Sequence, residues 1–185
     1  MERYKKTLQQ KRTALLVIDI QERIIKVINN HEKVVENTLK LIKGFKEMGL
    51  PVYYTEQYSK GLGQTVKELL EELDGVSAIE KSTFSCYSAG NLFNELSEKS
   101  LDQIVICGVE AHVCVQQTTL DLLENGFQVN LAADAVSSRR EFDFQTAIDR
   151  MRFAGAEITT TESVLFELLE VCCTEVFKKI SKLVK

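Results

Sequence analysis

The sequence has few of the residues that mark several special classes of protein. Its 185 residues include one proline, nine glycines, two histidines and no tryptophan. This composition, with 44% hydrophobic and 27% charged residues, excludes a fibrous or low-complexity chain and is typical of a folded globular protein. At about 150 residues per domain, the length predicts a single domain.

Long apolar runs and an excess of positive charge are also missing. No run approaches the ~18 apolar residues that a membrane-spanning helix needs, so no membrane is expected as a partner. Residues 1–12 are charged and have no apolar core, so we expect them to form an arm before one domain at 13–185. The net charge of -4 gives no general attraction to a phosphate backbone, so no nucleic acid is expected either.

The cysteines and histidines give little from which to build a disulfide framework or a metal centre. Five cysteines form no CxxC pair, and an odd number of cysteines predicts reduced thiols and a cytoplasmic location. The two histidines, His31 and His112, are far apart and show no regular spacing with cysteine. We therefore expect no metal and no cofactor.

Strand-like and helix-like segments alternate along the chain. The continuous apolar run 14–18 is typical of a strand that is covered on both faces of a parallel sheet. Further strands are predicted at 51–55, 76–79, 103–107, 127–132 and 157–160. Helices are predicted at about 30–48, 65–73, 113–125 and 142–153, and from 163 onward. This alternation predicts an α/β fold, a three-layer α/β/α sandwich around a six-stranded parallel sheet.

Three residues with useful chemistry follow three of these predicted strands. Asp19 ends the first strand, Lys81 follows the third, and Cys114 begins the helix after the fourth. Ligands of open α/β sheets bind beyond the carboxyl ends of the strands, so these side chains are candidates for one site. A helix N-terminus and a nearby lysine would lower the pKa of the thiol, and Asp19 could accept its proton. The pattern predicts covalent catalysis.

Each of these residues could also have an ordinary structural role. A cysteine at an apolar helix start is often a small buried hydrophobe, an aspartate after a strand often caps a turn, and a loop lysine is usually solvated. The occurrence of all three at separate strand ends favours the chemical role. No P-loop, GxSxG, HExxH or dinucleotide-binding motif competes with it.

Several ordered segments resemble the isochorismatase-like cysteine hydrolases, and among them the isochorismatase domain-containing proteins. The segments are LVIDIQ at 16–21, TEQY at 55–58, GLG at 61–63, EKSTFS at 80–85, CGVEAHVCV at 107–115, DAVSSR at 134–139 and ITTTES at 158–163. The resemblance implies a Rossmann-like sheet with strand order 3-2-1-4-5-6. It also implies Cys114 as nucleophile, Asp19 as general base and later acid, and Lys81 as the cation that orients Asp19. A non-proline cis peptide is implied between Val109 and Glu110.

Departures from better-known members narrow the expected substrate. The isochorismatases that this chain resembles lack a cysteine at the nucleophile position, and nicotinamidases bind a metal through histidines that the TEQY segment lacks. We therefore expect hydrolysis of another small amide or related carbonyl compound through a thioester. Backbone N–H groups near Cys114 and the Val109–Glu110 turn would hold the oxyanion.

Four further residues are weaker candidates for lining the substrate pocket. Glu56, Gln57 and Tyr58 follow the second strand, and Phe84 follows Lys81; ordinary loop polarity and aromatic packing account for them equally well. His112 lies two residues from Cys114 at a helix start, where it is expected to point elsewhere, so it ranks below Asp19 as the base.

Two other functional classes remain open at this point. The chain could be a binding or scaffold protein whose catalysis has lapsed, or a redox sensor that uses Cys114 with Cys107, Cys86 or the pair Cys172–Cys173. The resemblance also implies a homo-oligomer, a dimer or larger. The apolar positions between residues 164 and 183 suggest that the C-terminal segment forms part of its interface.

Overall fold

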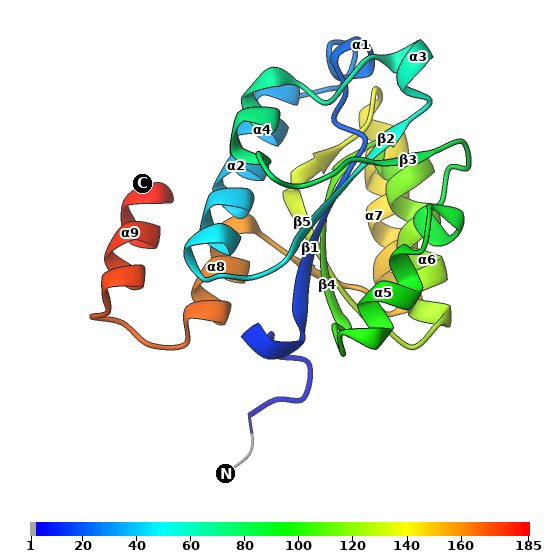
Figure 1. Cartoon of the computed structure of the whole chain (residues 1–185). Helices are drawn as coiled ribbons and strands as arrows, with labels where there is room; N and C mark the ends of the chain where they lie inside the picture. Colours follow the sequence, from blue (N-terminus) through cyan, green and yellow to red (C-terminus); the bar gives the residue numbers. More distant parts are fainter. Residues whose placement is uncertain (1–2) are drawn as a thin grey trace.

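The sheet has the predicted number of strands in the predicted order. The structure, a computed structural model, describes residues 3–185; Met1 and Glu2 of the expected arm lie outside this range. Six parallel strands are hydrogen-bonded in the order β3-β2-β1-β4-β5-β6 (Figure 1). Their bounds are β1 Thr13–Ile18, β2 Val52–Gln57, β3 Ile79–Lys81, β4 Gln103–Val109, β5 Gln128–Ser137 and β6 Glu157–Thr159. The predicted three-layer α/β sandwich is confirmed.

Strand β1 lies at the centre of the sheet because both of its faces are apolar. Leu15 and Val17 point into one hydrophobic cluster, whereas Leu16 and Ile18 point into the other. All six residues of β1 are buried. The strand pairs with β2 on one side and with β4 on the other, so β1 and β4 form the switch point of the sheet.

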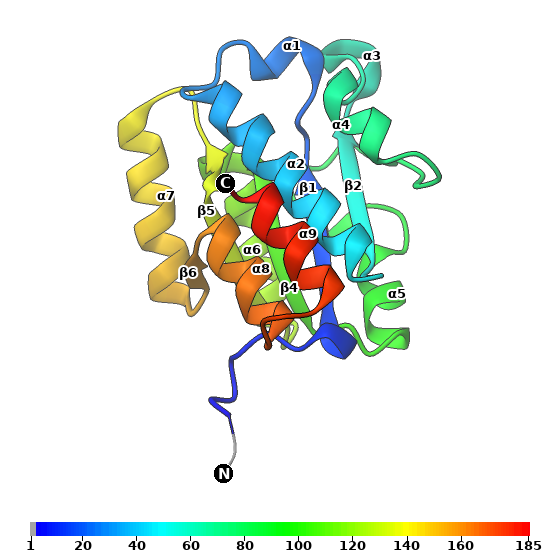
Figure 2. The ribbon, with the colours of Figure 1, turned by 90° about the vertical axis from the view of Figure 1, so that its left-hand side faces the viewer.

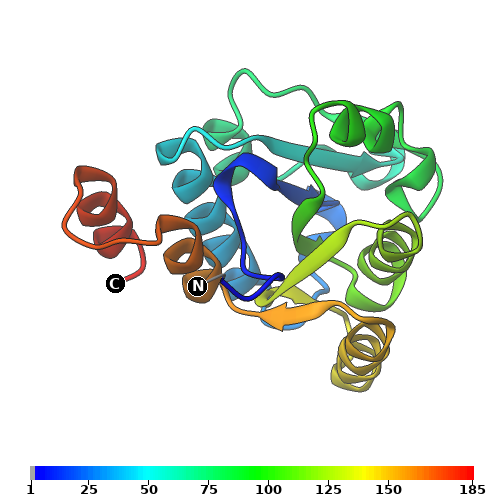
Figure 3. The same ribbon diagram turned by 90° about the horizontal axis from the view of Figure 1, so that it is seen from below.

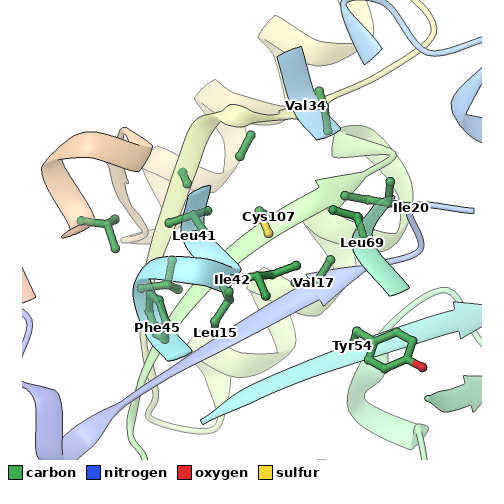
Figure 4. Packing of buried hydrophobic residues seen from close by; sticks show 14 of the residues in the cluster. Leu15, Val17, Ile20, Val34, Leu41, Ile42, Phe45, Tyr54, Leu69 and Cys107 are labelled. Carbon is green, nitrogen blue, oxygen red and sulfur yellow. The ribbon is translucent and has the colours of Figure 1, made fainter. Parts of the chain in front are cut away.

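Helices cover both faces of the sheet, as Figure 1 shows. One face carries α2 His31–Glu47, α4 Lys67–Glu72 and α8 Thr161–Leu169; the other carries α5 Leu92–Glu98, α6 Gln116–Glu124 and α7 Glu141–Ala154. On the first face, Phe45, Leu41 and Ile42 of α2 pack over Leu15 of β1 (Figure 4). Cys107 belongs to the same cluster and is fully buried.

The C-terminal helix α9 (Glu175–Leu183) lies outside α8 and α2 (Figure 2). It buries Ile180 against them, while Val176, Phe177 and Leu183 remain partly exposed. Much of the apolar content of this segment is therefore used within the chain.

The short elements mostly lie in the connections between strands and helices. They are η1 Gln10–Arg12, α1 Glu22–Ile25, α3 Ser59–Leu62, η2 Cys86–Ser88 and the π-helical turn η3 Ala111–Val115. Helix α5 was not among the sequence predictions, although its buried residues Leu92, Phe93 and Leu96 have helical spacing.

The third strand lies later in the chain than predicted. The apolar pattern predicts it at 76–79, whereas β3 begins at Ile79 and pairs Lys81 with Gln57. The apolar Val76 suggested the earlier position, but the bounds of β3 are determined by its pairing with the last three residues of β2. This register places the Lys81 side chain inside the protein.

The residues before β1 pack against the amino-terminal edge of the sheet. Leu8 is fully buried, and its N–H donates to Glu167 Oε1 at 2.6 Å. Arg12 forms a bidentate ion pair with Asp102, the residue before β4. The expected arm is therefore folded onto the domain over much of its length. Within residues 3–185, no helix is both long and apolar enough to cross a bilayer.

Candidate active site

Asp19 and Lys81 form a buried ion pair at the carboxyl edge of the sheet. Lys81 Nζ lies 2.6 Å from Asp19 Oδ2, and their side chains are 3% exposed for Asp19 and 0% exposed for Lys81. Asp19 directly follows β1, whereas Lys81 ends β3, two strands away in the sheet. A buried charge needs a partner of opposite sign, so each residue compensates the charge of the other.

Neutral oxygens complete the surroundings of the Lys81 ammonium. It donates to Gln57 Oε1 at 2.7 Å, to the Phe84 carbonyl at 3.1 Å and to the Thr83 carbonyl at 3.3 Å. Burial acts to lower the pKa of Lys81, but the negative charge of Asp19 opposes it and the pKa is raised overall. Lys81 is thus a fixed cation at neutral pH.

Thr55 holds the second oxygen of the Asp19 carboxylate. Its hydroxyl donates to Asp19 Oδ1 at 2.7 Å, and its carbonyl accepts the Asp19 N–H at 3.3 Å. Thr55 is not among the predicted site residues, although it belongs to the TEQY segment. Its importance follows from the register, which places it opposite Ile18, the residue before Asp19.

Cys114 lies in the π-helical turn η3 that follows β4. The residue is 7% exposed and belongs to the hydrophobic cluster on the α6 and α7 side of the sheet. The charges of Asp19 and Lys81 both act on the pKa of its thiol, which Asp19 raises and Lys81 lowers. Irregular helical turns of this type often occur at functional positions.

The expected lowering of the Cys114 pKa is wrong for this structure. Burial, followed by the negative charge of Asp19, raises the pKa of the thiol well above its usual range, and Lys81 only partly opposes this effect. The sequence showed the helix start and the lysine but not the depth of burial. The resting group is a neutral thiol beside a carboxylate.

Glu110 and Arg139 fix the turn that leads from β4 to Cys114. The Val109–Glu110 peptide bond is cis. The Glu110 carboxylate is buried and accepts from Arg139, with Nε 3.0 Å from Oε1 and the backbone N–H 3.2 Å from Oε2. The Glu110 carbonyl accepts from the N–H groups of Val113 and Val115. His112 is engaged nearby through Nδ1 with Ser138 Oγ at 2.9 Å.

Gln57 and Glu56 are adjacent in sequence but have different surroundings. The Gln57 side chain accepts a hydrogen bond from Lys81. The Gln21 side chain holds the Gln57 backbone, because its Oε1 accepts from the Gln57 N–H at 2.8 Å and its Nε2 donates to the Gln57 carbonyl at 3.1 Å. The buried Glu56 carboxylate instead accepts from the N–H and hydroxyl of Thr65 at 2.7 and 2.9 Å. Glu56 therefore anchors the loop before α4.

Tyr58 and Phe84 are the exposed members of the predicted set. Tyr58 lines a surface hollow of about 320 Å³ together with Lys81 and Ser82. Phe84 is also exposed, and its carbonyl contacts Lys81. A wider groove of about 870 Å³ lies between α1, α2 and α4, with Ile25, Val35 and Val66 in its walls. None of the three residues Asp19, Lys81 and Cys114 lines this groove.

The described residues offer no cluster suited to a metal ion. Within 3–185, no three His, Cys, Asp or Glu side chains group as a metal centre would require. The expected independence from metals and cofactors remains a prediction. The chemistry available is a thiol, a carboxylate that can accept its proton, and a fixed ammonium.

Comparison with known sequences identifies the family. The isochorismatase domain model matches residues 13–163. The chain belongs to the isochorismatase family. It is 41% identical to isochorismatase family protein 1A of Dictyostelium discoideum, covering 90% of this chain and 82% of that protein. It is 38% identical to human isochorismatase domain-containing protein 2, covering 94% of this chain and 83% of that protein.

Solved structures share the fold over nearly the whole chain. A structure described as MAR1 ribonuclease from Caenorhabditis elegans is 36% identical, with a TM-score of 0.90 and coverage of 96% and 91% of the two chains. YcaC from Pseudomonas aeruginosa, described with covalent acrylamide, is 26% identical, with a TM-score of 0.88 and coverage of 97% and 92%. Escherichia coli YcaC, described as an octameric hydrolase of unknown specificity, is 26% identical, with a TM-score of 0.85 and coverage of 92% and 85%. The chain thus has the fold of a family of hydrolases.

Proposed function

We propose that this isochorismatase-family protein is a cysteine hydrolase that cleaves the C–N bond of a small amide through a thioester on Cys114. The observation that carries the proposal is the buried Lys81–Asp19 pair, with Nζ and Oδ2 2.6 Å apart, electrostatically coupled to the Cys114 thiol. A nucleophile, a base and a fixed cation are the groups that covalent hydrolysis needs.

In the proposed first step, Asp19 takes the Cys114 proton as Sγ attacks the substrate carbonyl carbon. This transfer converts a carboxylate and a neutral thiol into a carboxylic acid and a sulfur that bonds to carbon. The positive charge of Lys81 remains throughout and offsets the negative charge that moves from Asp19 toward the substrate oxygen. The neutral resting thiol is consistent with proton transfer that occurs during attack rather than before it.

The second half of the reaction uses the same groups in reverse. Asp19 returns its proton to the leaving nitrogen, so ammonia or an amine departs and a thioester remains. Asp19 then accepts a proton from water, whose oxygen attacks the thioester carbon. Asp19 passes this proton to Sγ as the C–S bond breaks, which releases a carboxylic acid and the Cys114 thiol. Backbone N–H groups near Cys114 and the Val109–Glu110 turn are proposed to hold the oxyanion, and each such donor contributes about 2.7–4 kcal/mol in other enzymes.

The burial of the site supports a small substrate. Cys114 and Asp19 are almost completely buried, so a bulky group would have to displace the loops that surround them. The description of covalent acrylamide in the relative YcaC also supports a reactive nucleophile in this fold, since the activated alkene of acrylamide adds readily to thiols. Phe84 and Tyr58, which are exposed near Lys81, are proposed as the outer part of the substrate path.

A second candidate activity comes from the name of one relative. A structure with 36% identity is described as a ribonuclease, so RNA is the alternative substrate. The net charge of -4 and the burial of Cys114 argue for a small neutral substrate instead. We further propose a homo-oligomer, as in octameric YcaC, and a reducing cytoplasmic location, which suits five free cysteines.

The test is a panel of small primary amides, with ammonia release and intact protein mass measured together. We expect turnover of at least one amide and, when the reaction is stopped early with acid, a mass increase equal to the acyl group on the peptide that contains Cys114. Cys107→Ala is the matched control, because Cys107 is another buried thiol but lies in the core on the opposite face of the sheet.

The two variants must behave differently. Cys114→Ala is expected to abolish both turnover and acylation, whereas Cys107→Ala keeps turnover per folded chain. Turnover by Cys114→Ala would contradict the thioester route. Cleavage of RNA without amide turnover would favour the ribonuclease, and Cys114-dependent oxidation by peroxide without any turnover would favour a redox sensor.

A further inference from the structure

Helix α7 carries two large apolar side chains that face solvent. Phe142 is 81% exposed and Phe153 is 98% exposed. The inner face of the same helix is already filled, because Ala147, Ile148 and Met151 are buried against the sheet and its neighbours. Viewed from below, α7 occupies an outer corner of the molecule (Figure 3). Two such phenylalanines on one helix point to a contact outside this chain.

The exposed face of α7 has a symmetric sequence. At 100° per residue, positions 142, 146, 149 and 153 fall within one narrow stripe, which reads Phe142, Thr146, Asp149 and Phe153. The two phenylalanines are about 16 Å apart along the axis at 1.5 Å per residue. The outer pair is Phe142 and Phe153, and the inner pair is Thr146 and Asp149. Both pairs are centred midway between residues 147 and 148.

We propose that this stripe is a contact between two copies of the chain, with the two α7 helices antiparallel about a two-fold axis. Phe142 of each copy then lies against Phe153 of the other. The shorter side chains of Thr146 and Asp149 lie between them, and the Thr146 hydroxyl stays on the Phe142 carbonyl of its own helix at 2.8 Å. A two-fold contact uses the same patch on both subunits, so the patch must complement itself when reversed. This stripe meets that condition.

Charge favours the antiparallel arrangement over the parallel one. The first turn of α7 carries Glu141 and Asp143, whereas the last part carries Arg150 and Arg152. An antiparallel pair places the acidic end of each helix beside the basic end of the other. A parallel pair would place like charges together. Arg152 also pairs with Asp149 in its own chain at 2.6 Å, which keeps both side chains on the outer surface.

The inference rests on the homo-oligomer of the proposed function and names one of its contacts. It adds a second surface to the C-terminal segment, which the sequence predicts to form part of the interface. It also bears on the site, because the inner face of α7 packs on η3, the turn that carries Cys114. A second copy on the outer face would hold α7 in place over that turn.

Cross-linking tests the arrangement directly. The background carries Cys172→Ser and Cys173→Ser, because these are the two exposed cysteines. One preparation then has Phe142→Cys and the other Phe153→Cys. We expect a short bismaleimide to link the two chains efficiently when the preparations are mixed, and to link neither variant to itself. Self-linking of each variant alone, or no link in the mixture, would overturn the proposed contact.

Sedimentation equilibrium provides the independent measurement. Phe142→Glu and Phe153→Glu are each expected to weaken association by about 30-fold or more, as loss of a central interface residue does. Val171→Glu is the matched control, because Val171 is an exposed apolar residue beside the C-terminal helices. A wild-type chain that stays monomeric would reject both the oligomer and this contact. An assembly that resists both Phe variants but dissociates with Val171→Glu would reject the α7 contact alone, and amide turnover is measured separately.

Discussion

Ile18 and Gly108 face each other across β1 and β4, directly before the two segments that carry Asp19 and Cys114. Gly108 has a φ of +123°, and a Cβ at this position would lie 2.1 Å from the Ile18 carbonyl oxygen. The two backbones can therefore approach at the switch point only if residue 108 has no side chain.

This close approach predicts a severe effect of Gly108→Ala. The added methyl group would have to displace the backbone of Ile18 rather than a flexible side chain. Alanine would also be strained at the positive φ of residue 108. We expect a loss of more than about 4 kcal/mol in unfolding free energy, or failure to fold. Urea unfolding followed by circular dichroism measures it.

Gly126→Ala is the matched control for that substitution. Gly126 also has a positive φ of +84°, but no atom lies within 4 Å of its hypothetical Cβ. The substitution should cost only the backbone strain of about 1–2 kcal/mol. Equal losses for the two variants would show that the contact with Ile18 has no special importance.

The strands at the switch point could be predicted from the sequence because they are continuous apolar runs. Segments such as Ala14–Ile18 and Ile104–Cys107 are buried on both faces, which is the environment that short, continuous apolar runs favour in a parallel sheet. The edge strand β3 was harder to predict, since Glu80 is exposed and only three residues pair. Its position depends on β2, which a local pattern does not contain.

The candidate site could be predicted in its residue types but not in its electrostatics. The family resemblance pointed to Asp19, Lys81 and Cys114, and strand order brings their segments to one edge. Thr55 was missed because its role depends on pairing with β1. The direction of the Cys114 pKa was mistaken because burial arises from tertiary packing on all sides of the thiol.

Thr55→Val is expected to reduce kcat without a matching change in KM. The substitution keeps the shape of the side chain but removes the 2.7 Å hydrogen bond to Asp19 Oδ1. Hydrogen bonds to charged groups contribute about 1.5–3 kcal/mol, so a fall of about 10- to 100-fold follows if this bond orients the base. Steady-state kinetics on the amide found in the screen measures it.

Thr55→Ser is the control for this prediction, because it retains the hydroxyl. It should keep kcat within a few fold of the wild-type value. A Thr55→Val variant with unchanged kcat would show that Lys81 and Gln57 are sufficient to position the site.

Lys81→Met is expected to damage both stability and turnover. It removes the cation and leaves Asp19 as an unpaired buried carboxylate, a change that typically costs about 3–5 kcal/mol. Adding Asp19→Asn should restore most of the unfolding free energy, since no buried charge then lacks a partner. Turnover should stay absent in the double variant, because the base is also lost.

A double-mutant cycle of unfolding free energies measures this coupling. The substitutions Lys81→Met and Asp19→Asn must be strongly non-additive if the two charges compensate each other. Additive losses would mean that solvent already screens the pair, contrary to its burial.

The buried thiols predict a loss of stability at alkaline pH. Burial raises the pKa of Cys86 to about 11 and that of Cys107 to about 12, and it also raises the pKa of Cys114. In the unfolded chain these thiols ionise near pH ~8.5, whereas in the folded chain they still hold their protons. The folded state thus binds more protons above that pH, so the free energy of unfolding must fall as pH rises.

The size of the effect distinguishes this cause from general alkaline denaturation. Each buried thiol contributes a slope of at most about 1.4 kcal/mol per pH unit once the unfolded thiol is ionised. We expect stability to be nearly constant from about pH 7 to 8 and to decline steeply between about pH 9 and 10, which urea midpoints can measure. Cys107→Ala should reduce that slope by about one third, because it removes one of three such groups. An unchanged slope in this variant would mean that ionisation of the core thiols does not govern stability in this range.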